Sequence, residues 1–272
     1  MEHPIQDIAN ELAYFSLFEK AEKSRWKITE IPWDQIDKSK VDEELIALVK
    51  SIAASELTTF SATRSFMELF EDDIDFSQWL AVWLYEETKH PHVLIKWLSM
   101  VGEPVSGQFL LEGREIQPMN QSKVESLTFN IISEIVAGST YLHGKNQIPE
   151  PVLQTILDKL GKDEMRHSVG FAHYCKKWIN EAENPDKERM LCLRATWVFL
   201  DRNVTLNHPI ALLARQLETN LGESTIQDIR SRVASRISKV VGVDIPDADG
   251  IYEVYQGFKG ECRQKKRGYR VP

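Results

Sequence analysis

Two copies of the short pattern Glu-x-x-His occur in this chain, at Glu87–His90 and at Glu164–His167. Each copy is preceded by another glutamate within an apolar stretch: Glu56 lies 31 residues before the first copy, and Glu134 lies 30 residues before the second. Residues i and i+3 of a helix lie on the same face, about one turn apart, so a glutamate and a histidine at this spacing reach the same metal ion. The matched spacing indicates an internal duplication of a helix pair that carries metal ligands.

Four glutamates and two histidines in this order are the inward-facing set with which a four-helix bundle holds two metal ions. A single Glu-x-x-His is usually a solvated helix face, but here all four glutamates fall at core-facing positions. Carboxylates bridge two divalent ions, and imidazole completes a mixed N/O shell that suits two iron ions (Fe2+/Fe3+), manganese or a mixed Mn/Fe pair. The predicted ligands are Glu56 and His90 for one ion, Glu134 and His167 for the other, and Glu87 and Glu164 as bridges.

An acidic residue stands immediately before each motif, Glu86 before the first and Asp163 before the second. Such an acid can accept the second N–H of the histidine on the opposite helix pair, which fixes the tautomer and orientation of the imidazole. Lys89 and Arg166 are placed to neutralise these two acids. The alternative is that all four are ordinary surface charges.

Helix geometry also places several side chains within about two turns of the predicted ligands. They either line a substrate pocket or belong to plain core packing. The small residues among them would leave room beside the metals for oxygen or substrate. The candidate pocket residues are Thr59, Phe60, Thr63, Trp83, Ile131, Ala137, Gly138 and Phe171.

The elements that must position these residues are helices, since the apolar residues recur at helical spacing and no useful strand-like alternation is present. Pro91 should bend the second long helix because it removes a backbone hydrogen bond, and Asp75 or Ser77 is expected to cap that helix. The segment from Gly102 to about residue 118 fits a crossover connection along the bundle. The four long helices are predicted at 42–70, 76–100, 121–142 and 149–182.

The predicted fold class is therefore all-α, a ferritin-like four-helix bundle with a dimetal site, in one domain over 1–272. An N-terminal arm at 1–41, with a helix near 5–23, is expected to be pinned to the bundle by Trp26 and Trp33. Additional helices and a basic tail follow the bundle. The predicted parts are 1–41 for the arm, 42–183 for the metal-binding bundle and 184–272 for the remainder, with helices at 187–203, 210–221 and 225–240.

Composition excludes several classes of function. The net charge of −8 argues against a nucleic-acid binder, and no apolar run reaches the ~18 residues of a membrane span. Three cysteines without CxxC spacing, and an N-terminus without a secretory signal, indicate reduced thiols and a cytoplasmic protein. The C-terminal basic residues form either a solvated, frayed tail or a docking patch for an acidic partner; they are Lys259, Arg263, Lys265, Lys266, Arg267 and Arg270.

The segment 79–90, with Glu-Glu-x-x-His at its end, resembles the corresponding helix of the soluble acyl carrier protein desaturases, and the resemblance continues over 94–102. The run Asp-Glu-Met-Arg-His at 163–167 resembles their second motif, Asp-Glu-x-Arg-His. The resemblance covers roughly 42–183, with a weaker echo in the C-terminal helices. The paired motif is specific for ferritin-like dimetal carboxylate proteins. It is much less specific for desaturation, because hydroxylases, N-oxygenases and ferritins have the same ligands.

One position departs from the desaturase pattern. Those enzymes have a threonine one turn after the glutamate of the third helix, and such a hydroxyl is thought to help deliver protons during oxygen activation. Here that position is Ala137, followed by Gly138, and hydroxyls occur only at Ser139 and Thr140.

The leading hypothesis is a non-haem di-iron oxidase or oxygenase that activates O2 to desaturate or hydroxylate an organic substrate. The resemblance implies a small-molecule or acyl substrate, free or on an acyl carrier protein, and a homodimer. Two electrons would come from an external ferredoxin or reductase, since no Gly-rich nucleotide motif is present. The alternatives are a ferroxidase or iron-handling ferritin-like protein and a non-catalytic, metal-bearing ligand-binding module. A ferritin cage subunit needs little beyond the four helices, so the N-terminal arm and the residues after the bundle argue against the iron-handling alternative.

Overall fold

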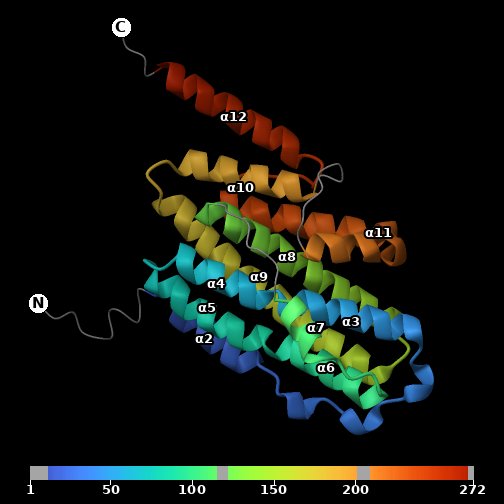
Figure 1. The fold of residues 1–272 in the computed structure, drawn as a ribbon. Helices are drawn as coiled ribbons and strands as arrows, with labels where there is room; N and C mark the ends of the chain where they lie inside the picture. The colour runs from blue at the N-terminus through green and yellow to red at the C-terminus, as the bar shows by residue number, and fades with distance from the viewer. Residues whose placement is uncertain (1–11, 115–121, 201–208, 269–272) are drawn as a thin grey trace, which may run out of the picture. The chain divides into compact units, whose positions relative to one another are not determined.

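A computed structural model describes residues 12–114, 122–200 and 209–268, and their side chains except those of 209–221 and 261–268. Within these ranges the secondary structure is helical and includes no strand (Figure 1), so the predicted all-α class is confirmed. By internal contacts the chain divides into two compact units. Unit 1 is Met1–Pro118 with Gly144–Asp163, and unit 2 is Met119–His143 with Glu164–Pro272.

Unit 1 contains helices from the arm, from the first two predicted long helices and from the predicted crossover segment. α9 begins in unit 1 and ends in unit 2. The α-helices are α2 (Ala13–Ser24), α3 (Glu43–Leu57), α4 (Thr59–Leu69), α5 (Ile74–Glu87), α6 (Lys89–Val101), α7 (Gly107–Glu112) and α9 (Pro151–Glu181). Short 3-10 turns connect them at Ile28–Glu30, Trp33–Gln35, Lys38–Lys40 and Lys145–Gln147.

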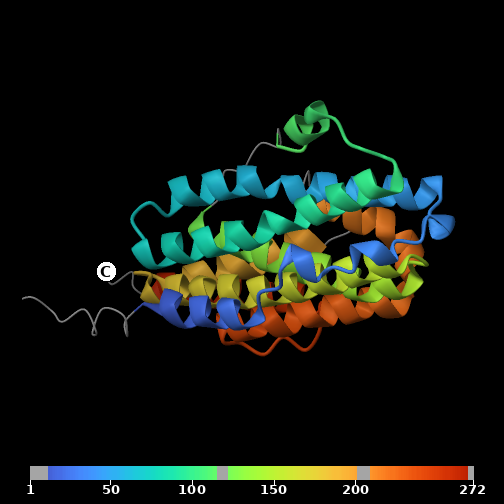
Figure 2. The ribbon, with the colours of Figure 1, turned by 90° about the horizontal axis from the view of Figure 1, so that it is seen from below.

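Unit 1 is organised around two antiparallel rods. The first consists of α3 followed by α4, and the second of α5 followed by α6 (Figure 2); α3 packs along α6, and α4 packs along α5. Apolar positions at helical spacing are buried between them, among them Val49, Ile52 and Leu94. Burying such side chains is worth roughly 1.5–3 kcal/mol each and stabilises the packing of the two rods.

Both rods are interrupted for one residue beside a predicted metal ligand. The sequence predicts one helix over 42–70, but α3 ends at Leu57 and α4 begins at Thr59. At Thr58 the backbone N–H bonds the carbonyl of Ser55, three residues back, which is the tighter 3-10 pattern. The second rod is interrupted at Thr88, close to Pro91, whose missing N–H cannot bond the residue-87 carbonyl.

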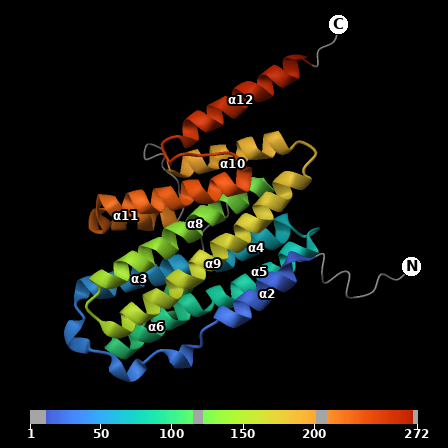
Figure 3. The same ribbon diagram turned by 180° about the vertical axis from the view of Figure 1, so that it is seen from behind.

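The start of the second rod corrects a cap prediction. Asp73, rather than Asp75 or Ser77, caps α5 by accepting from the Phe76 N–H at 3.0 Å. Asp75 instead lies buried and accepts from the N–H groups of Ala13 and Tyr14, at 3.3 and 2.8 Å. It thereby caps α2, which lies beside α5 (Figure 3). A cap supplied by another helix is invisible to local sequence rules.

The segment after α6 was predicted as a crossover loop to residue 118. Its described part turns at Gly102, which has a φ of 107°, and then forms α7. α7 packs on α3. A Cβ at Gly113 would lie 2.7 Å from the Leu57 side chain, so only glycine allows this approach. Residues 115–118 lie outside the described ranges.

Unit 2 contains the predicted third helix and the C-terminal helices. They are α8 (Lys123–Gly144), the second part of α9, α10 (Pro185–Leu200), α11 (Pro209–Val241) and α12 (Ile251–Gly268). α10 packs against both α11 and α12. Gly222, with a φ of 71°, interrupts α11 between the two helices predicted there. The C-terminal segment, for which the sequence left open a solvated, frayed tail or a docking patch, is helical through residue 268.

The packing of α12 depends on aromatic rings. Trp197 of α10 lies 5.0 Å from Tyr252 and stacks on Tyr255 at 6.3 Å between ring centroids. Lys259 extends over the Tyr255 ring. The other residues of the predicted basic patch lie among the side chains that the structure does not describe, so its function as a docking surface stays a prediction.

The described cysteines are core residues. Cys175 and Cys192 are free thiols with no exposed surface. A hydrogen bond with the Cys192 thiol, reinforced by burial, raises the pKa of Cys175 well above its usual range. A thiol with a raised pKa forms little thiolate and is unreactive. Cys262 lies among the undescribed side chains.

One described stretch passes a simple test for a membrane span. Glu43–Leu69 is long and apolar enough by length and composition. Core helices of soluble proteins pass the same test, and this stretch is interrupted at Thr58, buries Glu56 and packs along α5 and α6. The absence of a membrane span stays a prediction from sequence.

Candidate metal centre

The first three predicted ligands lie together in unit 1. Glu56 is near the end of α3, Glu87 is the last residue of α5, and His90 is the second residue of α6. The Nδ1 atom of His90 lies 3.4 Å from Oε2 of Glu56 and 3.7 Å from Oε2 of Glu87. The ligand atoms of all three residues fall within 4.8 Å of one another. We refer to these three residues as the first ligand set.

The first ligand set is almost closed to solvent. Its exposed fractions are 6% for Glu56, 4% for Glu87 and 0% for His90. The helical period explains this burial, since Ile52 precedes Glu56 by one turn and Trp83 precedes Glu87 by one turn, and both are buried. The acids therefore share the face of the helix that packs inward.

The other three predicted ligands lie together in unit 2. Glu134 is in the middle of α8, and Glu164 and His167 are one turn apart on α9. The Nδ1 atom of His167 lies 3.4 Å from Oε2 of Glu164 and 3.6 Å from Oε2 of Glu134. Their ligand atoms again fall within 4.8 Å of one another, and their exposed fractions are 2–6%. These residues form the second ligand set, in which Asn130 donates from its side-chain nitrogen to Oε1 of Glu134 at 3.0 Å.

The chemistry of the donors fits a metal in each set. Each set brings two carboxylates and one imidazole nitrogen together in a nearly dry environment. Buried carboxylates are expensive unless they are paired or coordinate a cation. Oxygen and imidazole donors without thiolate match iron or manganese. Metal binding itself stays a prediction.

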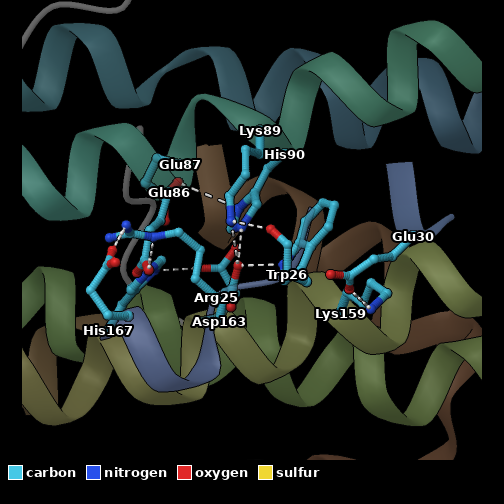
Figure 4. A network of polar contacts seen from close by, with 12 residues as sticks. Arg25, Trp26, Glu30, Glu86, Glu87, Lys89, His90, Lys159, Asp163 and His167 are labelled. Atoms are coloured by element: carbon cyan, nitrogen blue, oxygen red, sulfur yellow. Dashed lines mark hydrogen bonds and ion pairs between the residues drawn. The ribbon is translucent and has the colours of Figure 1, made fainter. Parts of the chain in front are cut away.

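Asp163 was predicted to orient a histidine, and the structure places it at His90. Oδ2 of Asp163 lies 3.4 Å from Nε2 of His90 and accepts a hydrogen bond from Nε1 of Trp26 at 2.7 Å (Figure 4). With Nε2 donating to Asp163, Nδ1 of His90 is the unprotonated nitrogen that faces the two glutamates. Lys89, predicted to neutralise such an acid, lies nearby, with its Nζ 3.9 Å from the same Oδ2.

Glu86 has a partner that the sequence analysis missed. Nε of Arg25 lies 3.2 Å from Oε1 of Glu86, which is 1% exposed (Figure 4). Arg25 and Trp26 are adjacent in the arm, and each contacts one of the two acids that precede a motif. Their partners are 61 and 137 residues away along the chain. In the sequence, the pair of tryptophans in the arm was the only indication that the arm contacts this region. Arg166 is half-buried on α9.

The candidate pocket residues divide into two groups. Most are buried, namely Thr59, Thr63, Trp83, Ile131, Ala137, Gly138 and Phe171. Phe60 is half-buried, and Arg114 lies over its ring at 4.0 Å, so its described contact is packing with the segment after α7. Thr59 has the most direct link to a ligand, because its Oγ1 lies 3.1 Å from Oε2 of Glu87. A function in substrate binding stays a prediction for all of them.

The arrangement of the helices assigns the chain to a structural class. The chain has the ferritin-like helical fold that the motifs predicted. No family model matches the chain, and no curated protein matches it. The similarity appears in solved structures, which are point mutants of R2-like ligand-binding oxidases.

One such structure, with an aerobically reconstituted Mn/Fe cofactor, has a TM-score of 0.59 at 19% identity, over 89% of this chain and 98% of that chain. A second, with an anaerobically reconstituted Mn/Fe cofactor, has a TM-score of 0.56 at 19% identity, over 89% and 97% of the two chains. Identity at this level establishes the fold alone. The near-complete coverage of both chains shows that the similarity extends beyond the predicted bundle.

Proposed function

We propose that the two ligand sets together form one dimetal centre and that the protein is an oxidase that uses O2. The single observation that carries the proposal is the repeated geometry, in which a histidine Nδ1 lies 3.4–3.7 Å from two buried carboxylates in each set. The Mn/Fe cofactors of the similar structures support two iron ions or a mixed Mn/Fe pair. In this centre Glu87 and Glu164 would hold both ions, while the other four residues would each hold one.

The metal pair, when bound, supplies the redox chemistry that reduces O2 and oxidises an organic ligand. The residues of the chain fix the geometry and exclude water. Asp163 holds the proton on Nε2 of His90, so that Nδ1 is the donor atom. Lys89 offsets the charge of Asp163, and Trp26 holds this carboxylate in place. Because the glutamates are nearly dry, their electrostatic interactions with bound ions are stronger than they would be in water.

We propose the finer features of the function from the motifs. The Glu-Glu-x-x-His and Asp-Glu-x-Arg-His runs favour a small-molecule or acyl substrate, desaturated or hydroxylated, with a ferredoxin or reductase as the electron donor. An acyl carrier protein is a candidate partner for the basic C-terminal helix. A cytoplasmic homodimer fits this proposal. Size-exclusion chromatography tests it against iron storage, because a large shell would support storage instead.

The decisive experiment replaces Glu164 with alanine. Wild-type protein loaded with Fe2+, or with Mn2+ and Fe2+, should bind two ions per chain as a spin-coupled pair in electron paramagnetic resonance and Mössbauer spectra. Glu164→Ala should lose one metal equivalent and O2 consumption but keep its helical circular dichroism. Glu181→Ala, on the exposed end of the same helix, should behave like the wild type. Two uncoupled ions in the wild type, or full O2 consumption by Glu164→Ala, would refute the proposal.

A further inference from the structure

Thr59 is a buried hydroxyl that contacts a predicted metal ligand directly. It is the first residue of α4, immediately after the interruption at Thr58, and it is 8% exposed. Its Oγ1 donates to Oε2 of Glu87 across the gap between the two rods, at 3.1 Å. The same carboxylate oxygen lies 3.7 Å from Nδ1 of His90. The hydroxyl therefore bonds the oxygen of Glu87 that faces the other members of the first ligand set.

The neighbouring threonines behave differently, although they are on the same rod. Oγ1 of Thr63 donates to the carbonyl of Thr59 at 2.8 Å, and Oγ1 of Thr58 donates to the carbonyl of Ser55 at 2.7 Å. Such bonds to a carbonyl three or four residues back are the usual choice of a helical threonine. At the interruption, Thr58 bonds the Ser55 carbonyl through both its N–H and its hydroxyl. Thr59 reaches instead to α5.

We propose that Thr59 is a positioning residue that fixes the orientation of the Glu87 carboxylate for metal binding. The inference rests on the proposed function, because it assigns Glu87 to the dimetal centre. A carboxylate attached through single bonds can rotate, and each rotation presents different lone pairs to an ion. The hydrogen bond from Thr59 selects one orientation, so every molecule presents the same oxygen arrangement. Thr59 follows the interruption of the first rod directly, and its hydroxyl bonds Glu87 instead of a backbone carbonyl.

The test compares four variants that lack a threonine hydroxyl, a threonine methyl group or both. Thr59→Val removes the hydroxyl at nearly constant volume, and Thr59→Ser keeps it. Thr59→Ala removes it without placing a methyl group against the carboxylate, so a steric effect of valine is recognised. Thr63→Val is the matched control, because Thr63 is equally buried on α4 but donates only to the backbone.

Titration with Mn2+ alone and with Fe2+ alone should show that Thr59→Val and Thr59→Ala still bind two equivalents, one of them about 10-fold more weakly. Their electron paramagnetic resonance spectra should be broader, because the Glu87 carboxylate adopts several orientations. Thr59→Ser and Thr63→Val should match the wild type in affinity and line width.

The inference is overturned if Thr59→Val and Thr59→Ala match Thr63→Val in both measurements. It is also overturned if Thr59→Ser shows the same loss as Thr59→Val, since packing would then explain the effect. Failure of the proposed function is distinguishable, because it shows in the wild type as fewer than two ions or as uncoupled ions. A coupled pair in the wild type with no effect at Thr59 removes only this inference.

Discussion

Replacing Trp26 with phenylalanine tests whether the N-terminal arm supports the first ligand set. The indole Nε1 donates a 2.7 Å hydrogen bond to Oδ2 of Asp163, which is 1% exposed. A hydrogen bond to a charged group contributes about 1.5–3 kcal/mol, so the substitution should lower the free energy of unfolding by about 2 kcal/mol. Phenylalanine keeps an aromatic ring beneath Lys89, whose Nζ lies 4.5 Å from the indole centroid, so much of that cation–π contact survives.

The same substitution should weaken metal binding. Asp163 fixes the imidazole of His90, and Trp26 fixes Asp163. Loss of an outer partner of a ligating histidine typically lowers metal affinity by about 10–100-fold. We therefore expect one of the two Mn2+ equivalents to bind at least about 10-fold more weakly in Trp26→Phe.

Trp33→Phe is the matched control. Trp33 is also in the arm, its Nε1 donates to the Ile28 carbonyl at 2.9 Å, and Nζ of Lys96 lies 4.2 Å from its ring centroid. Its loss should lower stability by about 1 kcal/mol, the contribution of a neutral hydrogen bond, and leave Mn2+ binding unchanged. Urea denaturation gives the stabilities, and calorimetric titration gives the affinities. Wild-type Mn2+ affinity in Trp26→Phe would refute the support of the first ligand set by this hydrogen bond.

Two further predictions concern stability. Glu150, fully buried, accepts from Nε1 of Trp97 and from two N–H groups in the first turn of α9; Glu150→Ala should lower the free energy of unfolding by about 3 kcal/mol in urea denaturation, and a loss below about 1 kcal/mol would contradict this. Burial raises the pKa of Asp158, but hydrogen bonds from Lys145 and Lys162 outweigh it and hold this pKa below its ordinary value. Stability from this depressed pKa is present at neutral pH and is lost as the pH falls below about 4. Asp158→Asn should therefore lose up to about 1 kcal/mol at pH 7, and this difference from wild type should shrink at low pH; a difference independent of pH would contradict the assignment.

The ligand sets could be predicted from sequence because the relevant signals are local. A glutamate and a histidine three residues apart share a helix face whatever the tertiary structure is. The upstream acids, Glu56 and Glu134, were recognised because each lies in phase with apolar residues that must face inward. The long helices followed from the same periodicity.

The supporting contacts could not be predicted because they join residues that are distant in sequence. No local rule connects Trp26 to Asp163 or Arg25 to Glu86. The interruption at Thr58 also escaped prediction, since neither proline nor glycine marks it. Pro91 did mark the interruption of the second rod, because its missing N–H has a local consequence.

The repeat in the sequence suggests two equivalent metal positions, but the described contacts argue for two different ones. In the first ligand set a hydroxyl, that of Thr59, bonds Glu87, which is a proposed bridging ligand. In the second set an amide, that of Asn130, bonds Glu134, which is a proposed terminal ligand. Hydrogen bonds to ligating carboxylates tune the affinity of a site for its metal. Identical ligands with differently supported carboxylates would give two bound ions chemically distinct surroundings.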